Sequence, residues 1–138
     1  MNRNDFKTLA RVRLKEARTL LKAGLYAGAY YLTGYVVECG LKACIAKKTK
    51  RFDFPPEKKA IEDVYTHSPT RLIVAAKLGK ELDEEKAANP DFSKAWAVVA
   101  NWSEVSRYGS RDETAARALF DAVTNPKYGV FRWIRKHW

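Results

Sequence analysis

The sequence predicts an all-α protein, an antiparallel up-and-down bundle of four to five helices in a single domain over residues 1–138. Apolar side chains recur along most of the chain at the three- and four-residue spacing of helices. No stretch alternates between apolar and polar residues with the period of a strand. The 138 residues, 46% of them hydrophobic, are enough to bury roughly two thirds of the surface of the unfolded chain.

The first helix is expected over residues 5–22. Phe6 and Leu9 begin an apolar face at helical spacing, and Gly24 stands where a helix commonly ends. The opposite face is basic, with side chains three or four positions apart: Lys7, Arg11, Lys15, Arg18 and Lys22.

A second helix is expected over residues 27–48. It is apolar nearly all round, which predicts a position in the centre of the bundle. Its small residues allow neighbouring helices to approach closely. Two of them, Gly34 and Gly40, each lower the intrinsic stability of the helix by about 1 kcal/mol relative to alanine.

The rest of the chain is divided by prolines, glycines and asparagines. Pro55-Pro56 marks the clearest break, and Ser68-Pro69 is typical of a helix start, with a capping serine before proline. The remaining helical segments are expected over residues 57–65 (a short turn), 69–78, 80–88, 92–103, 112–125 and 130–137.

Charge is distributed unevenly along the chain. The 26 Lys and Arg residues exceed the 16 Asp and Glu residues, for a net charge of +10. Residues 1–51 hold twelve basic and three acidic side chains, residues 52–125 hold ten and thirteen, and residues 126–138 hold four and none. Two basic ends favour a polyanionic partner, such as nucleic acid, nucleotides or an acidic protein. The alternative is a charged surface that only keeps the protein in solution.

The cysteines and the hydropathy bound the class of protein further. Cys39 and Cys44 are five positions apart in one expected helix, which turns them too far apart to form a disulfide with each other. No Cys and His residues have the spacing of a zinc site, so no metal is expected. No cofactor is expected either. No apolar run approaches the roughly 18 residues of a membrane span. A cytoplasmic protein without a membrane partner is expected.

A polar stripe interrupts the apolar second helix. Tyr31, Tyr35, Glu38 and Lys42 follow one another at i, i+4, i+7 and i+11, which places them along one face. One interpretation is an exposed seam, in which Glu38 and Lys42 form an ordinary ion pair of about 0.3–0.5 kcal/mol. The other is a polar groove in which Glu38 orients a basic group.

The segment Ala29–Ala43, AYYLTGYVVECGLKA, resembles the second-helix signature of HEPN domains (higher eukaryotes and prokaryotes nucleotide-binding). The resemblance continues through residues 17–26, His67 to Leu78 and Trp102 to Tyr108, in the order of the family. It implies an up-and-down helical bundle, commonly a homodimer with a cleft near the dimer seam. Members of the family act as metal-independent ribonucleases, as partners of small nucleotidyltransferases in toxin–antitoxin pairs, or as nucleotide-binding modules.

The resemblance does not extend to the ribonuclease motif of the family, in which an arginine is followed, after four to six residues, by a histidine near the start of the last helix. The corresponding positions after Arg107 are residues 112–114, Asp-Glu-Thr. Arg132 and His137 have the required spacing, but they lie at the C-terminal end, where chains tend to fray. The chance occurrence of such a pair is high in a chain with many arginines.

His67 is the other residue that can exchange protons near neutral pH. It stands directly before the expected helix start at Ser68, where the alternative is a capping or packing role. Neither a glycine-rich phosphate loop nor a nucleophile elbow accompanies it in the sequence.

These observations favour a HEPN-type module, expected as a homodimer, that binds RNA or nucleotide phosphates without the family's ribonuclease chemistry. Arg107 would contact a phosphate through its guanidinium group, and Glu38 would orient Arg107. Tyr31, Tyr35 and Tyr108 would line the cleft, and Lys42 would add positive charge. The enzymatic alternative is a metal-independent ribonuclease that uses Arg107 with His67, or Arg132 with His137. A further alternative is a protein-interaction module whose partner is a nucleotidyltransferase.

Overall fold

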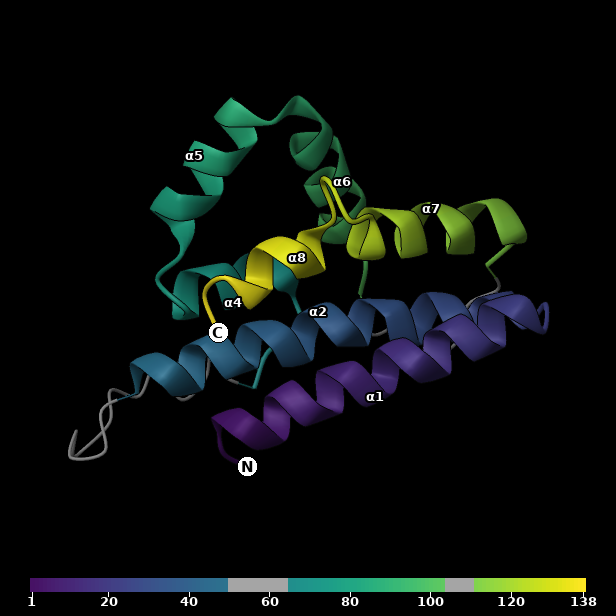
Figure 1. Ribbon diagram of the computed structural model, residues 1–138, viewed down its shortest axis with the longest axis horizontal. Coiled ribbons are helices and arrows are strands. Elements are labelled where there is room, and N and C mark those ends of the chain that lie inside the picture. The colour runs from purple at the N-terminus through teal and green to yellow at the C-terminus, as the bar shows by residue number, and fades with distance from the viewer. Residues whose placement is uncertain (50–64, 104–110) are drawn as a thin grey trace.

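The computed structural model describes residues 1–49, 65–103 and 111–138, and these residues form an all-α fold (Figure 1). The helices are α1 (Arg3–Lys22), α2 (Tyr26–Lys48), α4 (Pro69–Ala75), α5 (Gly79–Ala88), α6 (Pro90–Ala100), α7 (Glu113–Thr124) and α8 (Val130–Arg135). The predicted fold class is confirmed. The described residues form seven helices, more than the four to five expected, because the second half of the chain is divided into short helices at prolines and glycines. The short turn expected at 57–65 lies outside the described residues, apart from Tyr65.

The two long helices, α1 and α2, lie side by side and run in opposite directions along the molecule (Figure 1). The shorter helices are arranged on the other side of α2, which contacts α4, α7 and α8 as well as α1. Residues of α2 are buried on every side of the helix. The predicted central position of this helix is therefore confirmed.

Side-chain caps set where four of the helices, α1, α4, α6 and α7, begin. Asn2 and Asp5 form a reciprocal capping box at the start of α1. Ser68, Asn89 and Asp112 each accept a hydrogen bond from a backbone N–H in the first turn of α4, α6 and α7. These side chains satisfy amides that have no partner within the helix.

The end of α4 differs from its sequence prediction. The helix ends at Ala75, before the expected end at Leu78, because Lys77 adopts a left-handed φ of 57°. The Leu78 N–H then bonds the carbonyl of Ile73 at 3.1 Å, which closes the helix.

Glycine allows two close approaches to α2. A Cβ placed on Gly34 would lie 2.0 Å from Cε2 of Trp102, so the indole packs directly on the backbone of α2. A Cβ on Gly40 would lie 2.9 Å from Cγ2 of Ile134 on α8. The two glycines therefore fit α2 against the end of α6 and against α8.

The C-terminal end of the described chain is packed, which corrects the expectation of fraying. Trp138 is buried, and its backbone carbonyl accepts a hydrogen bond from the Arg3 guanidinium at 2.8 Å. The Lys7 ammonium and the Arg11 guanidinium lie over its indole ring. Nowhere in the parts of the chain that the structure describes is a helix long and apolar enough to cross a membrane.

Both cysteines are free and buried. Burial raises the pKa of the Cys39 thiol from 9.0 to about 12, with a further contribution from the charge of Glu38. Burial also raises the pKa of the Cys44 thiol to about 11. A thiol attacks a disulfide reagent as its thiolate, so two neutral, buried thiols are expected to be unreactive.

We expect no reaction of Cys39 or Cys44 with an aromatic disulfide reagent at pH 8 in the folded protein, and reaction of both after unfolding in guanidinium. A thiol that reacts at the same rate in the folded and unfolded protein would contradict this expectation.

Because both thiol pKa values are raised in the folded state, their contribution to stability is complete below about pH 9. It declines as the pH rises through the folded-state values, which denaturant titrations at pH 8 and pH 10 would measure.

Candidate functional site

Among the described residues Glu38 is the buried carboxylate, with 1% of its surface exposed. Thr33 is the other fully buried polar side chain among the described residues, and it is satisfied by donating to the Ala29 carbonyl at 2.6 Å. A buried carboxylate requires partners, because loss of its hydration costs several kcal/mol. The interpretation of the stripe as an exposed seam is therefore wrong at Glu38.

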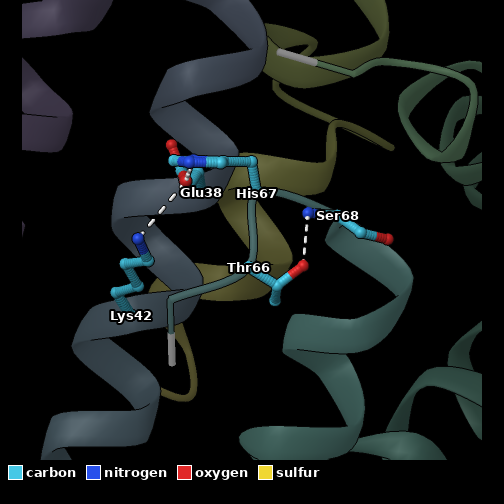
Figure 2. Close-up of polar contacts among 5 residues, drawn as sticks. All are labelled: Glu38, Lys42, Thr66, His67 and Ser68. Atoms are coloured by element: carbon cyan, nitrogen blue, oxygen red, sulfur yellow. Dashed lines mark hydrogen bonds and ion pairs between the residues drawn. The ribbon is translucent and has the colours of Figure 1, made fainter. Parts of the chain in front are cut away.

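Glu38 has two basic partners, both on the same oxygen (Figure 2). Its Oε1 accepts a hydrogen bond from Lys42 Nζ at 3.3 Å, one turn further along α2. The same oxygen contacts Nδ1 of His67, which comes from the segment before α4. The side chains of Lys42 and His67 are 16% and 38% exposed, so both extend from the carboxylate toward solvent.

The local sequence around His67 holds its ring against α2. The Thr66 hydroxyl accepts a hydrogen bond from the Ser68 N–H at 3.2 Å, which forms a tight turn around His67. Ser68 caps α4, and Pro69 begins that helix. In Figure 2 the side chains of Thr66 and Ser68 point away from Glu38, whereas the imidazole of His67 lies beside it. The capping role near the helix start thus belongs to Ser68, and His67 is the partner of Glu38.

Glu38 and His67 each line a different surface hollow. The larger, here called the His67 hollow, has a volume of about 530 Å³. It is lined by Thr66, His67, Ser68, Ala100, Asn101, Trp102 and Ser103. The smaller, called the Glu38 hollow, has a volume of about 240 Å³. It is lined by Met1, Phe6, Leu9, Tyr35, Glu38, Cys39, Lys42 and Tyr65.

The two tyrosines of the stripe lie in different surroundings. Tyr35 lines the Glu38 hollow, where burial and then the charge of Glu38 raise the pKa of its phenol. Tyr31 lines neither hollow among the described residues. Its ring stacks on Trp102, with 6.1 Å between ring centroids and an interplanar angle of 29°. Tyr31 thus supports the indole that lines the His67 hollow.

Arg107 and Tyr108 lie in residues 104–110, outside the described residues. The expectation that Glu38 orients Arg107 stays a prediction. The two basic groups that the structure places on Glu38 are Lys42 and His67.

Arg132 and His137 are engaged elsewhere. The Arg132 guanidinium pairs with Glu85 of α5 at 3.3 Å. The His137 ring packs on Trp133, and burial, together with the nearby lysine charges, lowers its pKa. Within the described residues neither side chain lines one of the two hollows. The structure therefore does not bring this pair to Glu38 and His67.

The described ranges hold no group of three or more His, Cys, Asp or Glu residues with the geometry of a metal site. What the site offers is a carboxylate, an imidazole and an ammonium group in contact, with hydroxyl and amide groups around the larger hollow. Such groups can donate and accept hydrogen bonds and can exchange protons.

Comparison with known proteins identifies the class of the chain. The family model for the HEPN domain matches residues 4–125, which include Glu38 and His67. The chain therefore belongs to the HEPN domain family, as the signature in its second helix suggested. Membership makes it a nucleotide- or RNA-related helical module in general. No curated protein and no solved structure gives a match to the chain.

Proposed function

We propose that this chain is a HEPN-type module that binds RNA or nucleotide phosphates at the His67 hollow. The observation that carries the proposal is the contact between Glu38 and His67, which fixes an imidazole at the wall of an open hollow. Thr66, Ser68 and Asn101 add hydroxyl and amide groups to the same wall. Groups of this kind contact phosphate and ribose oxygens in nucleic-acid interfaces.

The charge of the chain supports the same partner. The net charge is +10. Basic side chains of α1, among them Arg11, Lys15 and Arg18, are exposed. Such a surface attracts a phosphate backbone over a distance of about 10 Å at moderate salt. Arg107 follows Ser103, which lines the His67 hollow, by four residues in the sequence. In this function Arg107 is the residue that contacts a phosphate.

The test measures retention of labelled single-stranded RNA in EDTA across a salt series. Retention by the unmodified protein should weaken as salt increases, because bound phosphates release counterions. His67→Ala is expected to weaken binding about fivefold, the equivalent of one hydrogen bond of roughly 1 kcal/mol. Arg107→Ala should weaken binding at least as much and should lower the salt dependence. Lys94→Ala is the matched control, since Lys94 is an exposed cation on α6 that lines neither hollow.

Equal retention by the unmodified protein and by the His67→Ala and Arg107→Ala variants would refute the assignment of the hollow. Retention that falls by the same factor in the Lys94→Ala variant would show only a general effect of charge. If the unmodified protein neither retains nor cleaves RNA, the result favours the protein-interaction alternative, with a nucleotidyltransferase as partner. Size-exclusion chromatography with light scattering tests the expected homodimer.

The contact between Glu38 and His67 also favours a second candidate function, metal-independent RNA cleavage. In this reaction the 2′-hydroxyl oxygen attacks the adjacent phosphorus and the bond to the 5′ oxygen breaks. The products are a 2′,3′-cyclic phosphate and a 5′-hydroxyl. A base accepts the proton of the 2′-hydroxyl and an acid donates one to the leaving oxygen. A carboxylate on Nδ1 fixes the imidazole in the tautomer that exchanges its proton through Nε2. In the same assay, cleavage lost in both the His67→Ala and Arg107→Ala variants would establish this function.

A further inference from the structure

We propose that one face of α1 docks an acidic helix of a partner protein, whose carboxylates pair with a row of cations. The row has three- and four-residue spacing and is here called the basic stripe: Lys7, Arg11, Lys15, Arg18 and Lys22. None of these side chains lines the His67 hollow or the Glu38 hollow. The surface is therefore separate from the proposed RNA site, and the inference does not depend on that function.

The first observation is that the basic stripe has no carboxylate of its own. α1 contains two acidic residues: Asp5 belongs to the capping box, and Glu16 pairs with Arg13 at 2.7 Å. Within the described ranges no ion pair involves a cation of the stripe. On α7, by contrast, the exposed Arg117 pairs with Glu113 one turn away. Like charges four positions apart destabilise a helix, so the stripe retains a repulsion that an external anion relieves.

The second observation is that aromatic rings hold three of the cations in place. Lys7 Nζ lies 5.4 Å from the centre of the Trp138 ring, and Arg11 Cζ lies 5.0 Å from it. Arg18 Cζ lies 5.7 Å from the centre of the Phe120 ring. Side chains that are already ordered lose less conformational freedom on binding, so these cations are preorganised for a ligand.

Positive charge is concentrated around Lys7, at one end of the stripe. Loss of hydration, and then the charges of Arg3, Arg11 and Lys47, lower the pKa of its ammonium group. A carboxylate placed beside Lys7 would offset this excess of positive charge. The two basic ends of the sequence meet here, because Trp138 lies under the cations of α1.

The third observation concerns the class of polyanion. α1 lies at the edge of the bundle and packs mainly on α2 (Figure 1), and its buried residues are the apolar Ala10, Ala17 and Leu21. Its apolar face is therefore not available to enter a lipid surface. Interfaces for single-stranded RNA combine cations with exposed rings on which bases stack, whereas the rings of Trp138 and Phe120 lie beneath cations. A second copy of the chain is disfavoured by the net charge of +10.

An acidic helix has the geometry that the stripe requires. The stripe spans about 22 Å of α1, at the 1.5 Å rise per residue of an α-helix. A second helix laid along α1 has the same rise, so its carboxylates three and four positions apart come opposite successive cations. Rows of charge of this kind set partner choice between helices. Each exposed ion pair contributes little, so the complex should be weak and sensitive to salt.

The experiment measures fluorescence anisotropy of two labelled peptides that are built of alanine, glutamine and five glutamates. The matched peptide spaces its glutamates as the stripe spaces its cations, and the control peptide places them two positions apart, on both sides of the helix. Circular dichroism checks that the two peptides are equally helical. At low salt the matched peptide should bind about fivefold more tightly than the control, and high salt should abolish its binding.

Lys15→Glu reverses the charge at the middle of the stripe and should weaken binding of the matched peptide about tenfold. The substitution removes repulsion from Arg11 and Arg18, so the variant should remain folded, which a thermal melt checks. Lys94→Glu is the matched control, because it makes the same change of charge at an exposed position of α6. A third peptide, with lysine in place of the central glutamate, should bind Lys15→Glu more tightly than the matched peptide does.

The outcomes separate this inference from the proposed function. Equal binding of the matched and control peptides, or equal weakening by Lys15→Glu and Lys94→Glu, overturns the inference, because net charge alone then explains binding. Retention of single-stranded RNA or of phosphatidylserine vesicles that is lost in Lys15→Glu, without a preference between the peptides, assigns the stripe to that polyanion and also overturns it. A preference for the matched peptide, with no retention of RNA, supports the inference and overturns the proposed function.

Discussion

Replacement of Gly34 by alanine is expected to lower the free energy of unfolding by about 1–3 kcal/mol, the range for overpacking a core. The added methyl group would lie 2.0 Å from Cε2 and 2.2 Å from Cδ2 of Trp102. The indole is 2% exposed, so it has little room to move aside. Steric overlap therefore outweighs the gain of about 1 kcal/mol that alanine brings to a helix. Urea unfolding followed by circular dichroism measures the change.

Gly79→Ala is the matched control for this prediction. Beyond its chain neighbours and the nearby backbone of its own helix, nothing lies within 4 Å of the added methyl group, so the substitution should be neutral or slightly stabilising. A Gly34→Ala midpoint equal to or above that of the unmodified protein would contradict the close packing of Trp102 on α2. Trp102 also lines the His67 hollow, so RNA retention by Gly34→Ala should fall even at temperatures where the variant is fully folded.

Lys42→Met is expected to destabilise the protein by about 1.5–3 kcal/mol, the contribution of a hydrogen bond to a charged group. Glu38 is 1% exposed and Lys42 is 16% exposed, so solvent screens the pair only in part. Removal of the ammonium leaves the carboxylate with His67 alone among its described partners. Denaturant titration at pH 7 measures the loss. An unchanged midpoint would show that Lys42 contributes nothing to the burial of Glu38.

The double variant Glu38→Met with Lys42→Met provides the control. Replacing both members of a buried pair by apolar side chains of similar volume is often neutral. The double variant should therefore be more stable than Lys42→Met alone. It should nevertheless bind RNA less tightly than the unmodified protein, because His67 loses the group that positions its ring. A double variant that is more stable than Lys42→Met but binds RNA less tightly than the unmodified protein identifies the carboxylate of Glu38 as functional rather than structural.

Local sequence rules predicted most of the helices. The expected helices at 5–22 and 27–48 correspond to α1 and α2 with differences of one or two residues at their starts. Ser68-Pro69 and Asp112 act as the start signals that the sequence indicates. The end of α4 was placed too late because nothing in the sequence distinguishes Lys77, which adopts the left-handed conformation without being glycine or asparagine.

The candidate site was predictable only where its contacts are local. Glu38 and Lys42 are four residues apart on one helix, so their ion pair follows from spacing. Glu38 and His67 are separated by 29 residues, and their contact depends on how the segment before α4 packs on α2. The one signal for it was a single carboxylate in a helix that is otherwise apolar, since such a group requires a basic partner from elsewhere. The packing of Trp102 on Gly34 is equally non-local.

The helix α8 and the residues after it pack on α1 and α2 although they lie beyond the residues matched by the family model. The family match ends at residue 125, before α8 begins at Val130. Yet Ile134 fills the space above Gly40 of α2, and Trp138 lies under Lys7 and Arg11 of α1. The packed structure of this chain therefore extends beyond the residues that the family model matches. A protein shortened to the matched residues would retain the signature but would expose the surface of α2 that α8 covers.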